Sequence, residues 1–60
     1  MNRNIFITGA TSGIGKETAY AFAKNGDNVI LCARNIEKLR EIKADIDRKY
    51  GTNAYIFVLD

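Results

Sequence analysis

The sequence predicts an α/β fold in which three parallel strands alternate with two helices, in the order β-α-β-α-β. Three short runs of consecutive apolar residues, at 4–8, 28–33 and 54–59, are typical of strands buried in a parallel sheet. The two segments between them carry apolar residues every three or four positions, which is the spacing of a helix. Glycines lie between the predicted strands and helices, where the chain must turn.

The first predicted strand, Asn4–Thr8, leads into a stretch with three glycines. We expect Gly9 to leave the strand with a positive φ. We expect Gly13 to let a phosphate approach the backbone, and Gly15 to bring the next helix close to the strand. The first amides of that helix have no partner within it, and its dipole adds about half a positive charge. The arrangement is typical of a site for the diphosphate of a dinucleotide.

We predict the first helix over Gly13–Lys24, with Gly26 as a left-handed cap beyond its end. The residues at helical spacing, which we take as one face of this helix, are Ile14, Thr18, Ala21 and Phe22.

The second strand is predicted over Asn28–Ala33, and Asn35 is expected to cap a second helix over 36–50. Gly51 would end this helix, before a third strand over 54–59. The charged residues of the helix are interpreted as a solvated face, and its apolar face consists of Ile36, Leu39, Ile42, Ile46 and Tyr50.

Right-handed crossovers would place both helices on one face of the sheet. The strands are nevertheless apolar on both faces, and parallel sheets are normally covered on both sides. We therefore interpret the chain as the first half of a larger doubly wound sheet, or as a module whose bare face is covered by a partner.

Composition excludes several classes of protein. The net charge of +2 is small, and the positively charged residues are spread over a predicted helix rather than clustered. We therefore expect no nucleic-acid partner. No run approaches the ~20 apolar residues of a membrane span, and the start of the chain does not resemble a signal peptide. The single Cys32, interpreted as a small buried strand residue, fits a reducing compartment, so we expect a cytoplasmic protein. No spacing typical of metal ligands is present.

The end of the second strand indicates which dinucleotide is bound. In this kind of fold, the residue roughly 20 positions after the glycine turn meets the adenosine ribose: an acid holds the 2′-OH of NAD, and an arginine accepts the 2′-phosphate of NADP. Here Arg34 is the first residue past the strand and no carboxylate is present, so NADP is favoured over NAD. Asn35 could both cap the helix and touch the phosphate. The alternative is that Arg34 pairs at the surface with Glu37 or Glu41.

The residues from Thr8 to Gly15 read T-G-A-T-S-G-I-G, which resembles the cofactor signature T-G-x-x-x-G-x-G of the short-chain dehydrogenase/reductase family. A P-loop is excluded, since Glu17 replaces the hydroxyl residue that binds Mg²⁺ and Ala10 replaces the first glycine. The resemblance implies a Rossmann-type fold and hydride transfer between NADP and an alcohol or carbonyl substrate. The stretch C-A-R-N-x-E-K-L also resembles NADP-dependent dehydrogenases of serine and related 3-hydroxy acids.

The resemblance also implies a set of cofactor contacts. Asp60 would bind the adenine amino group, Arg34 and Asn35 the 2′-phosphate, and the contacts around the diphosphate would be Gly9, Thr11, Ser12, Gly13, Ile14 and Gly15.

The resemblance covers residues 1–60 but only about the first quarter of a family member, so these residues would be the N-terminal part of a single dinucleotide-binding domain. The family's catalytic Ser and Tyr-x-x-x-Lys would lie beyond Asp60. Tyr20 and Lys24 have that spacing, but they fall on the first helix and are interpreted as ordinary helix residues. The chain is therefore expected to hold a cofactor half-site without catalytic residues, in a parent that is expected to be a homo-oligomer. The alternative is a non-catalytic Rossmann module that senses a dinucleotide.

Overall fold

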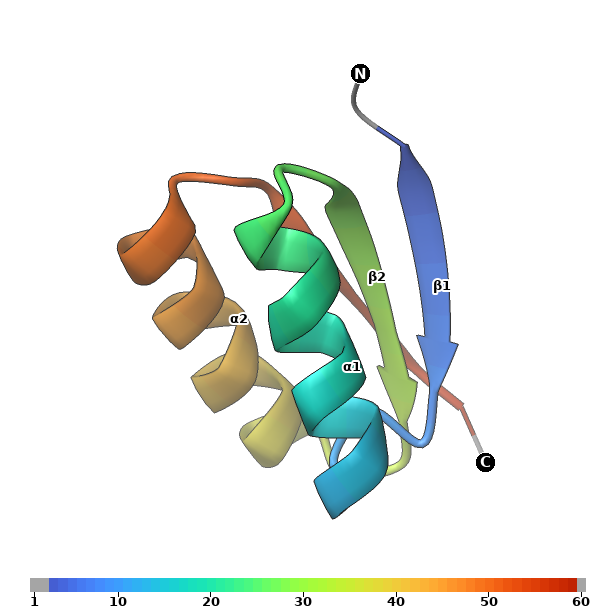
Figure 1. Ribbon diagram of the computed structural model, residues 1–60. Coiled ribbons are helices and arrows are strands. Elements are labelled where there is room, and N and C mark those ends of the chain that lie inside the picture. Colours follow the sequence, from blue (N-terminus) through green and yellow to red (C-terminus); the bar gives the residue numbers. More distant parts are fainter. Residues whose placement is uncertain (1–2, 60) are drawn as a thin grey trace.

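The computed structural model of the chain describes residues 3–59 and contains the five predicted elements in the predicted order (Figure 1). They are β1 (Asn4–Thr8), α1 (Gly13–Lys24), β2 (Asn28–Ala33), α2 (Ile36–Tyr50) and β3 (Ala54–Val58). The predicted bounds are confirmed except at the end of β3, which is one residue shorter. The amide of Leu59 still donates to the carbonyl of Ala33 (2.9 Å), but β2 has ended there and offers no further partner.

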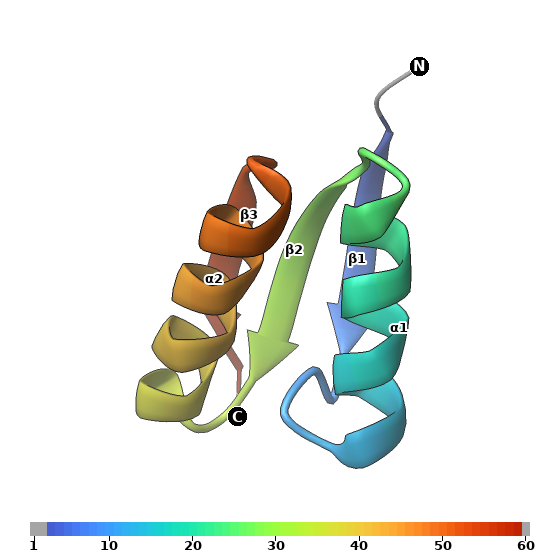
Figure 2. The ribbon, with the colours of Figure 1, turned by 60° about the vertical axis from the view of Figure 1, so that its left-hand side comes forward.

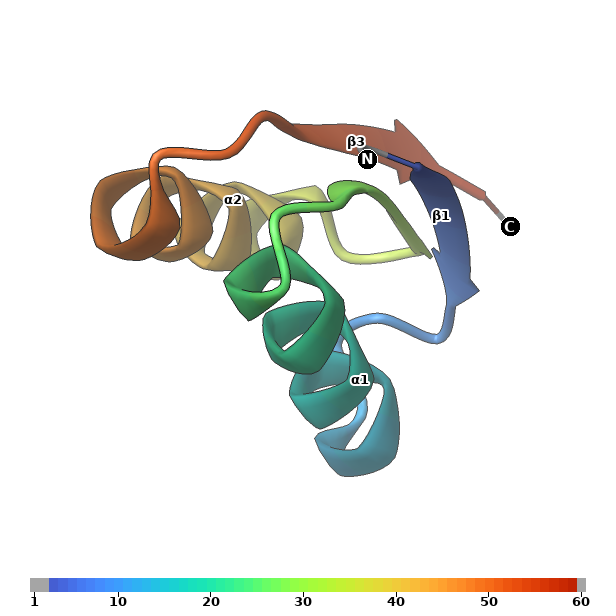
Figure 3. The same cartoon turned by 45° about the horizontal axis from the view of Figure 1, so that its top comes forward.

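The three strands form one parallel sheet in the order β1-β2-β3, with β2 in the centre. Both helices lie on the same face, as the right-handed crossovers predict (Figure 3). The core between helices and sheet is made of buried apolar side chains, among them Ile7, Val29, Leu31, Leu39, Ile42, Ile46 and Ala54.

The opposite face of the sheet carries large side chains that nothing in the described chain covers. Phe6, Tyr55 and Phe57 are 67%, 53% and 57% exposed, and the strand register aligns Phe6 and Tyr55 with Ile30 of β2. This confirms the prediction that one face of the sheet has no cover within residues 3–59.

The predicted face of α1 is wrong. Ile14 is 82% exposed, whereas the buried residues are Gly15, Ala19 and Ala23. Of the other predicted residues, Ala21 is exposed, and Thr18 and Phe22 are only partly buried. The reason is the close approach of α1 to the turn after β1: a Cβ on Gly15 would lie 2.2 Å from the carbonyl oxygen of Gly9. A helix that approaches so closely buries small residues rather than its bulkiest ones.

Helix α2 follows its predicted pattern. The Asn35 side chain accepts a hydrogen bond from the amide of Lys38 (3.1 Å), which is the expected N-cap. Gly51 ends the helix in the left-handed conformation, with φ of +63°. Of the predicted face, Leu39, Ile42 and Ile46 are buried, and Ile36 and Tyr50 partly so.

At the amino edge of the sheet, a buried carboxylate joins β1 to the turn before β2, a contact that the sequence pattern did not predict. Asp27 is fully buried and accepts from the backbone amide, Nε and Nη2 of Arg3 (3.3, 3.4 and 3.0 Å) and from Nδ2 of Asn25 (3.3 Å). The side-chain hydrogen bond from Arg3 is the main reason that the pKa of Asp27 lies below its ordinary value, although burial opposes this shift.

No helix between residues 3 and 59 is long and apolar enough to cross a bilayer. Within the same range, no three His, Cys, Asp or Glu side chains gather in a way that could hold a metal ion.

Candidate functional site

The turn after β1 and the loop after β2 lie at the carboxyl edge of the sheet, beside the N-termini of both helices (Figure 2). Gly9 has φ of +63°, as predicted, and this conformation turns the chain out of the strand. The amide of Ala10 donates to the carbonyl of Cys32 (3.1 Å), which fixes the turn against the end of β2. The site is therefore built on backbone that the sheet itself holds in place.

Ser12 is the N-cap of α1, and both hydrogen bonds of its hydroxyl group are made to backbone atoms of the turn. Its Oγ donates to the carbonyl of Gly9 (2.7 Å) and accepts from the amide of Gly15 (3.2 Å). Because a hydroxyl carries a single proton, this geometry leaves Ser12 able to accept but not to donate a further hydrogen bond. Its side chain mainly holds the shape of the turn.

The other two glycines differ in their surroundings. Gly15 has no room for a side chain, because a Cβ there would meet Gly9 O at 2.2 Å and Ala10 Cα at 3.1 Å. This confirms the close packing predicted for it. A Cβ on Gly13 would instead meet no atom within 4 Å. The backbone at Gly13 is thus open to a group that approaches from outside.

The first two amides of α1, those of Gly13 and Ile14, have no acceptor among residues 3–59. The amides of the next two residues are occupied, since Gly15 donates to Ser12 Oγ and Lys16 donates to Ser12 O (2.8 Å). Two free N–H donors at the positive end of a helix dipole form a cradle that suits an anion.

A cavity of about 440 Å³ lies at the carboxyl edge of the sheet, against the turn that leads from β1 into α1. It brings together four predicted site residues, Gly9, Thr11, Arg34 and Asn35, and its other lining residues are Thr8, Cys32, Ala33 and Leu59. Among residues 3–59, Arg34 is the only charged residue in this lining. No carboxylate within the described chain lies within 4.0 Å of its guanidinium group, so the alternative pairing with Glu37 or Glu41 does not form.

Two neutral residues complete the wall near Arg34. Asn35 uses its Oδ1 as the helix cap, whereas its Nδ2 donors have no acceptor in the part of the chain that the structure describes. It can therefore cap α2 and donate to a ligand at once, as predicted. Cys32 is 2% exposed and behaves as the small buried strand residue that was expected.

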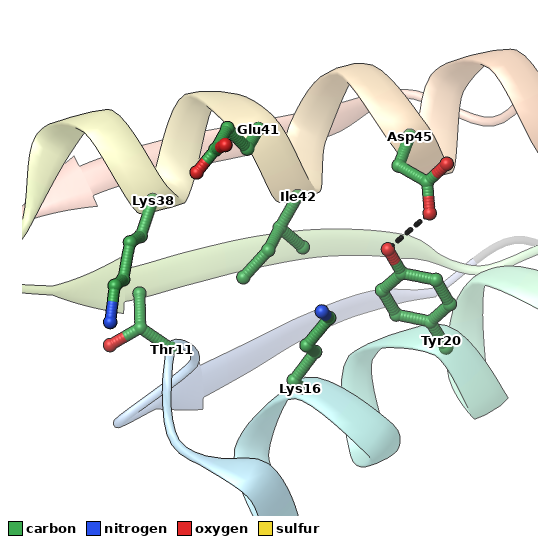
Figure 4. A pocket seen from close by; sticks show the side chains of 7 residues that line it. All are labelled: Thr11, Lys16, Tyr20, Lys38, Glu41, Ile42 and Asp45. Carbon is green, nitrogen blue, oxygen red and sulfur yellow. Dashed lines mark hydrogen bonds between the residues drawn. The ribbon is translucent and has the colours of Figure 1, made fainter.

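A second cavity, of about 400 Å³, lies in the groove between α1 and α2 (Figure 4). The hydroxyl of Tyr20 donates to Asp45 across this groove, and Arg48 and Lys49 pair with the same carboxylate (2.5 and 3.6 Å). Burial first, and then the hydrogen bond to Asp45, raise the pKa of Tyr20 to about 12. The tyrosine connects two helices, which agrees with its interpretation as an ordinary helix residue.

Sequence reasoning did not place Lys16 or Lys38 near the site, although both line the groove together with Thr11, Tyr20, Glu41, Ile42 and Asp45. Helical spacing shows which residues share a face but not which faces of two helices meet. The predicted adenine contact, Asp60, lies outside the described residues.

Known proteins that resemble this chain are dehydrogenases and other oxidoreductases. The family model for short chain dehydrogenases matches residues 3–60. An uncharacterized oxidoreductase of Escherichia coli K12, YciK, is 44% identical over 59 residues, which cover 98% of this chain and 23% of that protein.

Two solved structures are also similar. L-sorbose reductase from Gluconobacter frateurii, solved with NADPH and L-sorbose, has a TM-score of 0.94 at 34% identity, over 98% of this chain and 22% of the other. An alcohol dehydrogenase from the archaeon Thermococcus sibiricus, solved with 5-hydroxy-NADP, has a TM-score of 0.96 at 32% identity, over 100% of this chain and 26% of the other. This likeness confirms the Rossmann-type fold. The chain spans about a quarter of the length of these proteins.

Proposed function

The chain belongs to the short-chain dehydrogenase family, and we propose that it forms the adenosine and diphosphate half of the cofactor site in an NADP-dependent oxidoreductase. The substrate would be an alcohol or a carbonyl compound. The reacting groups would lie on parts of the complete natural protein other than these 60 residues.

The observation that carries the NADP assignment is the position of Arg34. Arg34 follows the carboxyl end of β2 and lines a cavity in which, among residues 3–59, no other charged residue and no acid that could hold the 2′-OH of NAD takes part. A planar guanidinium can bind a phosphate through two parallel hydrogen bonds, which a ribose hydroxyl cannot match. The two similar structures described above were solved with NADPH and a hydroxylated NADP, which supports the same choice.

The rest of the site fits the same cofactor. The free amides of Gly13 and Ile14 would hold the diphosphate, and the open backbone at Gly13 gives it room. Asn35 would contact the 2′-phosphate beside Arg34, and Thr11, which lines the same cavity, would lie at the diphosphate. NADP, when bound, supplies the hydride acceptor and donor. The role of this chain is to bind and orient it, not to react.

The buried free thiol of Cys32 is compatible with a reducing compartment, and we propose the cytoplasm as the location of the protein.

Two measurements on the complete natural protein test the proposal. Dissociation constants should be at least about tenfold lower for NADP⁺ than for NAD⁺, because a charge-assisted phosphate contact contributes about 1.5–3 kcal/mol. Oxidation of NADPH should then depend on an aldehyde or ketone from a panel of carbonyl compounds. Equal affinity for the two dinucleotides would contradict the NADP assignment. Tight binding without turnover of any substrate would favour the alternative, a dinucleotide sensor.

A further inference from the structure

The outer edge of β3 has no strand beside it. The order β1-β2-β3 leaves β1 and β3 at the two edges of the described sheet. In the doubly wound Rossmann order, later strands are added beside β1, not beside β3. β3 therefore stays an edge strand in the complete fold, and the backbone groups on its outer side could pair with a strand of another chain.

The amides of β3 point alternately toward β2 and away from it. The amide of Leu59 donates to the carbonyl of Ala33 in β2 (2.9 Å). Amides an odd number of positions earlier, those of Ala54, Ile56 and Val58, therefore point outward. The strand itself carries no charged residue and no proline, which are common means of keeping an edge unpaired.

Two charged side chains of α2, which packs along β3 (Figure 2), lie at this outer edge. Asp47 Oδ1 accepts from the outward amide of Ala54 (3.0 Å), and Asp47 Oδ2 accepts from Nζ of Lys43 (2.6 Å). Lys43 also lines a cavity of about 490 Å³ together with Ala54, Tyr55 and other residues of β3. The ion pair thus occupies the first outward amide of the strand and holds an ammonium group beside the residues that follow.

Without this ion pair, β3 could pair with a second copy of itself. In an antiparallel arrangement centred on Ile56, the two Ile56 residues would exchange backbone hydrogen bonds across a two-fold axis. Tyr55 would then lie opposite Phe57 of the second copy, which is a favourable cross-strand aromatic pair. The same arrangement requires the amide of Ala54 to donate to the second copy, and Asp47 already occupies that amide.

We propose that the Lys43–Asp47 ion pair keeps the outer edge of β3 closed to a second copy of this chain. A strand that approached this edge would have to displace the carboxylate from the Ala54 amide and remove water from both charges, which is unfavourable. The inference does not depend on which dinucleotide the protein binds. It gives the pair a role in preventing association, in addition to its place within α2.

The test is the mass of the complete natural protein in sedimentation experiments over a range of concentrations. Asp47→Ala removes both the cap on Ala54 and the partner of Lys43. The mass of this variant should rise with concentration to at least about twice that of the wild-type assembly, because each freed edge can pair with another. Amide exchange of residues 54–58 should slow over the same concentrations.

Two further variants separate edge pairing from a general loss of stability. Asp45→Ala removes a carboxylate of α2 that pairs with Arg48 and Lys49 and makes no contact with β3, so this variant should keep the wild-type mass. Adding Val58→Pro to Asp47→Ala should restore the wild-type mass, because proline at this outward position blocks pairing but keeps the ladder to β2.

The proposal is overturned if Asp47→Ala keeps the wild-type mass at every concentration. It is also overturned if Asp45→Ala associates equally, or if Val58→Pro does not reverse the association, because another surface would then be responsible. If Asp47→Ala does not fold, Lys43→Met, which retains the cap on Ala54, is measured in the same way. It should associate as well, and an unchanged mass would overturn the proposal.

Discussion

Asp27 at the amino edge of the sheet and Arg34 at the carboxyl edge are both charged residues beside the ends of β2, but their surroundings differ. Asp27 is buried and accepts four hydrogen bonds from Arg3 and Asn25. Arg34 is exposed and has no carboxylate partner among residues 3–59. The free amides of Gly13 and Ile14 lie at the same carboxyl edge. Polar groups at one edge therefore stabilise the fold, and those at the other remain available to a ligand.

This comparison predicts that substitutions at the two edges change different quantities. Changes at the amino edge should alter stability and leave cofactor affinity intact. Changes at the carboxyl edge should alter cofactor affinity. Only substitutions that also disturb the packing of the turn after β1 should lower stability as well. Each of these variants is to be measured in the complete natural protein.

The largest effect is expected for Gly15→Ala, where the turn is both structural and functional. The new Cβ would meet the backbone of Gly9 at 2.2 Å, so the turn must move, at a cost of about 3 kcal/mol in the free energy of unfolding. The measurement is denaturant unfolding, accompanied by a titration with NADP⁺, whose affinity should also fall.

Gly13→Ala is the matched control for that variant. Its Cβ has free space, so stability should stay the same or rise slightly, whereas NADP⁺ affinity should fall because the methyl group occupies the approach to the diphosphate. Unchanged affinity in Gly13→Ala would show that the diphosphate does not lie against this backbone.

The next effect is expected for Asp27→Asn, which breaks the charged pair at the amino edge. The guanidinium of Arg3 would lose its ionic acceptor, and the melting temperature should fall by roughly 5 °C. Dissociation constants for NADP⁺ should match those of the wild-type protein. A changed affinity with unchanged stability would contradict the separation of the two edges.

The same carboxylate predicts a dependence of stability on pH. The pKa of Asp27 is lowered in the folded protein from its ordinary value of 3.8, mainly by the hydrogen bond from Arg3. Its contribution is therefore fully present above pH 3.8 and is lost as the pH falls through the folded pKa. Melting curves should show a steeper loss of stability below pH 3.8 in the wild-type protein than in Asp27→Asn. Parallel curves would contradict this assignment.

The smallest effect is expected for Tyr20→Phe, away from both edges. It removes the hydrogen bond to Asp45 but keeps the ring against Tyr50, so the free energy of unfolding should fall by about 1 kcal/mol. NADP⁺ affinity and turnover should not change. A loss of turnover would mean that Tyr20 has a chemical role after all.

The local parts of this structure could be predicted from sequence. Apolar runs predicted the strands, and cap residues such as Asn35 and Gly51 predicted where a helix begins and ends. Both signals depend on residues that are close together in the chain. The positive φ of Gly9 and the close packing of Gly15 followed from a known glycine spacing.

The contacts between distant residues could not be predicted in this way. Arg3 meets Asp27 and Tyr20 meets Asp45 across 24 and 25 positions, and neither spacing has a sequence signature. The buried face of α1 was predicted wrongly because Ile14 is strongly apolar, whereas the close approach at Gly15 selects small residues. Lys38 came near the site only through the packing of α2 beside α1.

If Arg34 selects the 2′-phosphate of NADP, the ratio of the NAD⁺ to the NADP⁺ dissociation constant should reverse in Arg34→Asp. A carboxylate at this position would repel the phosphate and could accept from the 2′-OH of NAD. We expect a ratio above one in the wild-type protein and below one in the variant. A ratio that stays the same in both would contradict it.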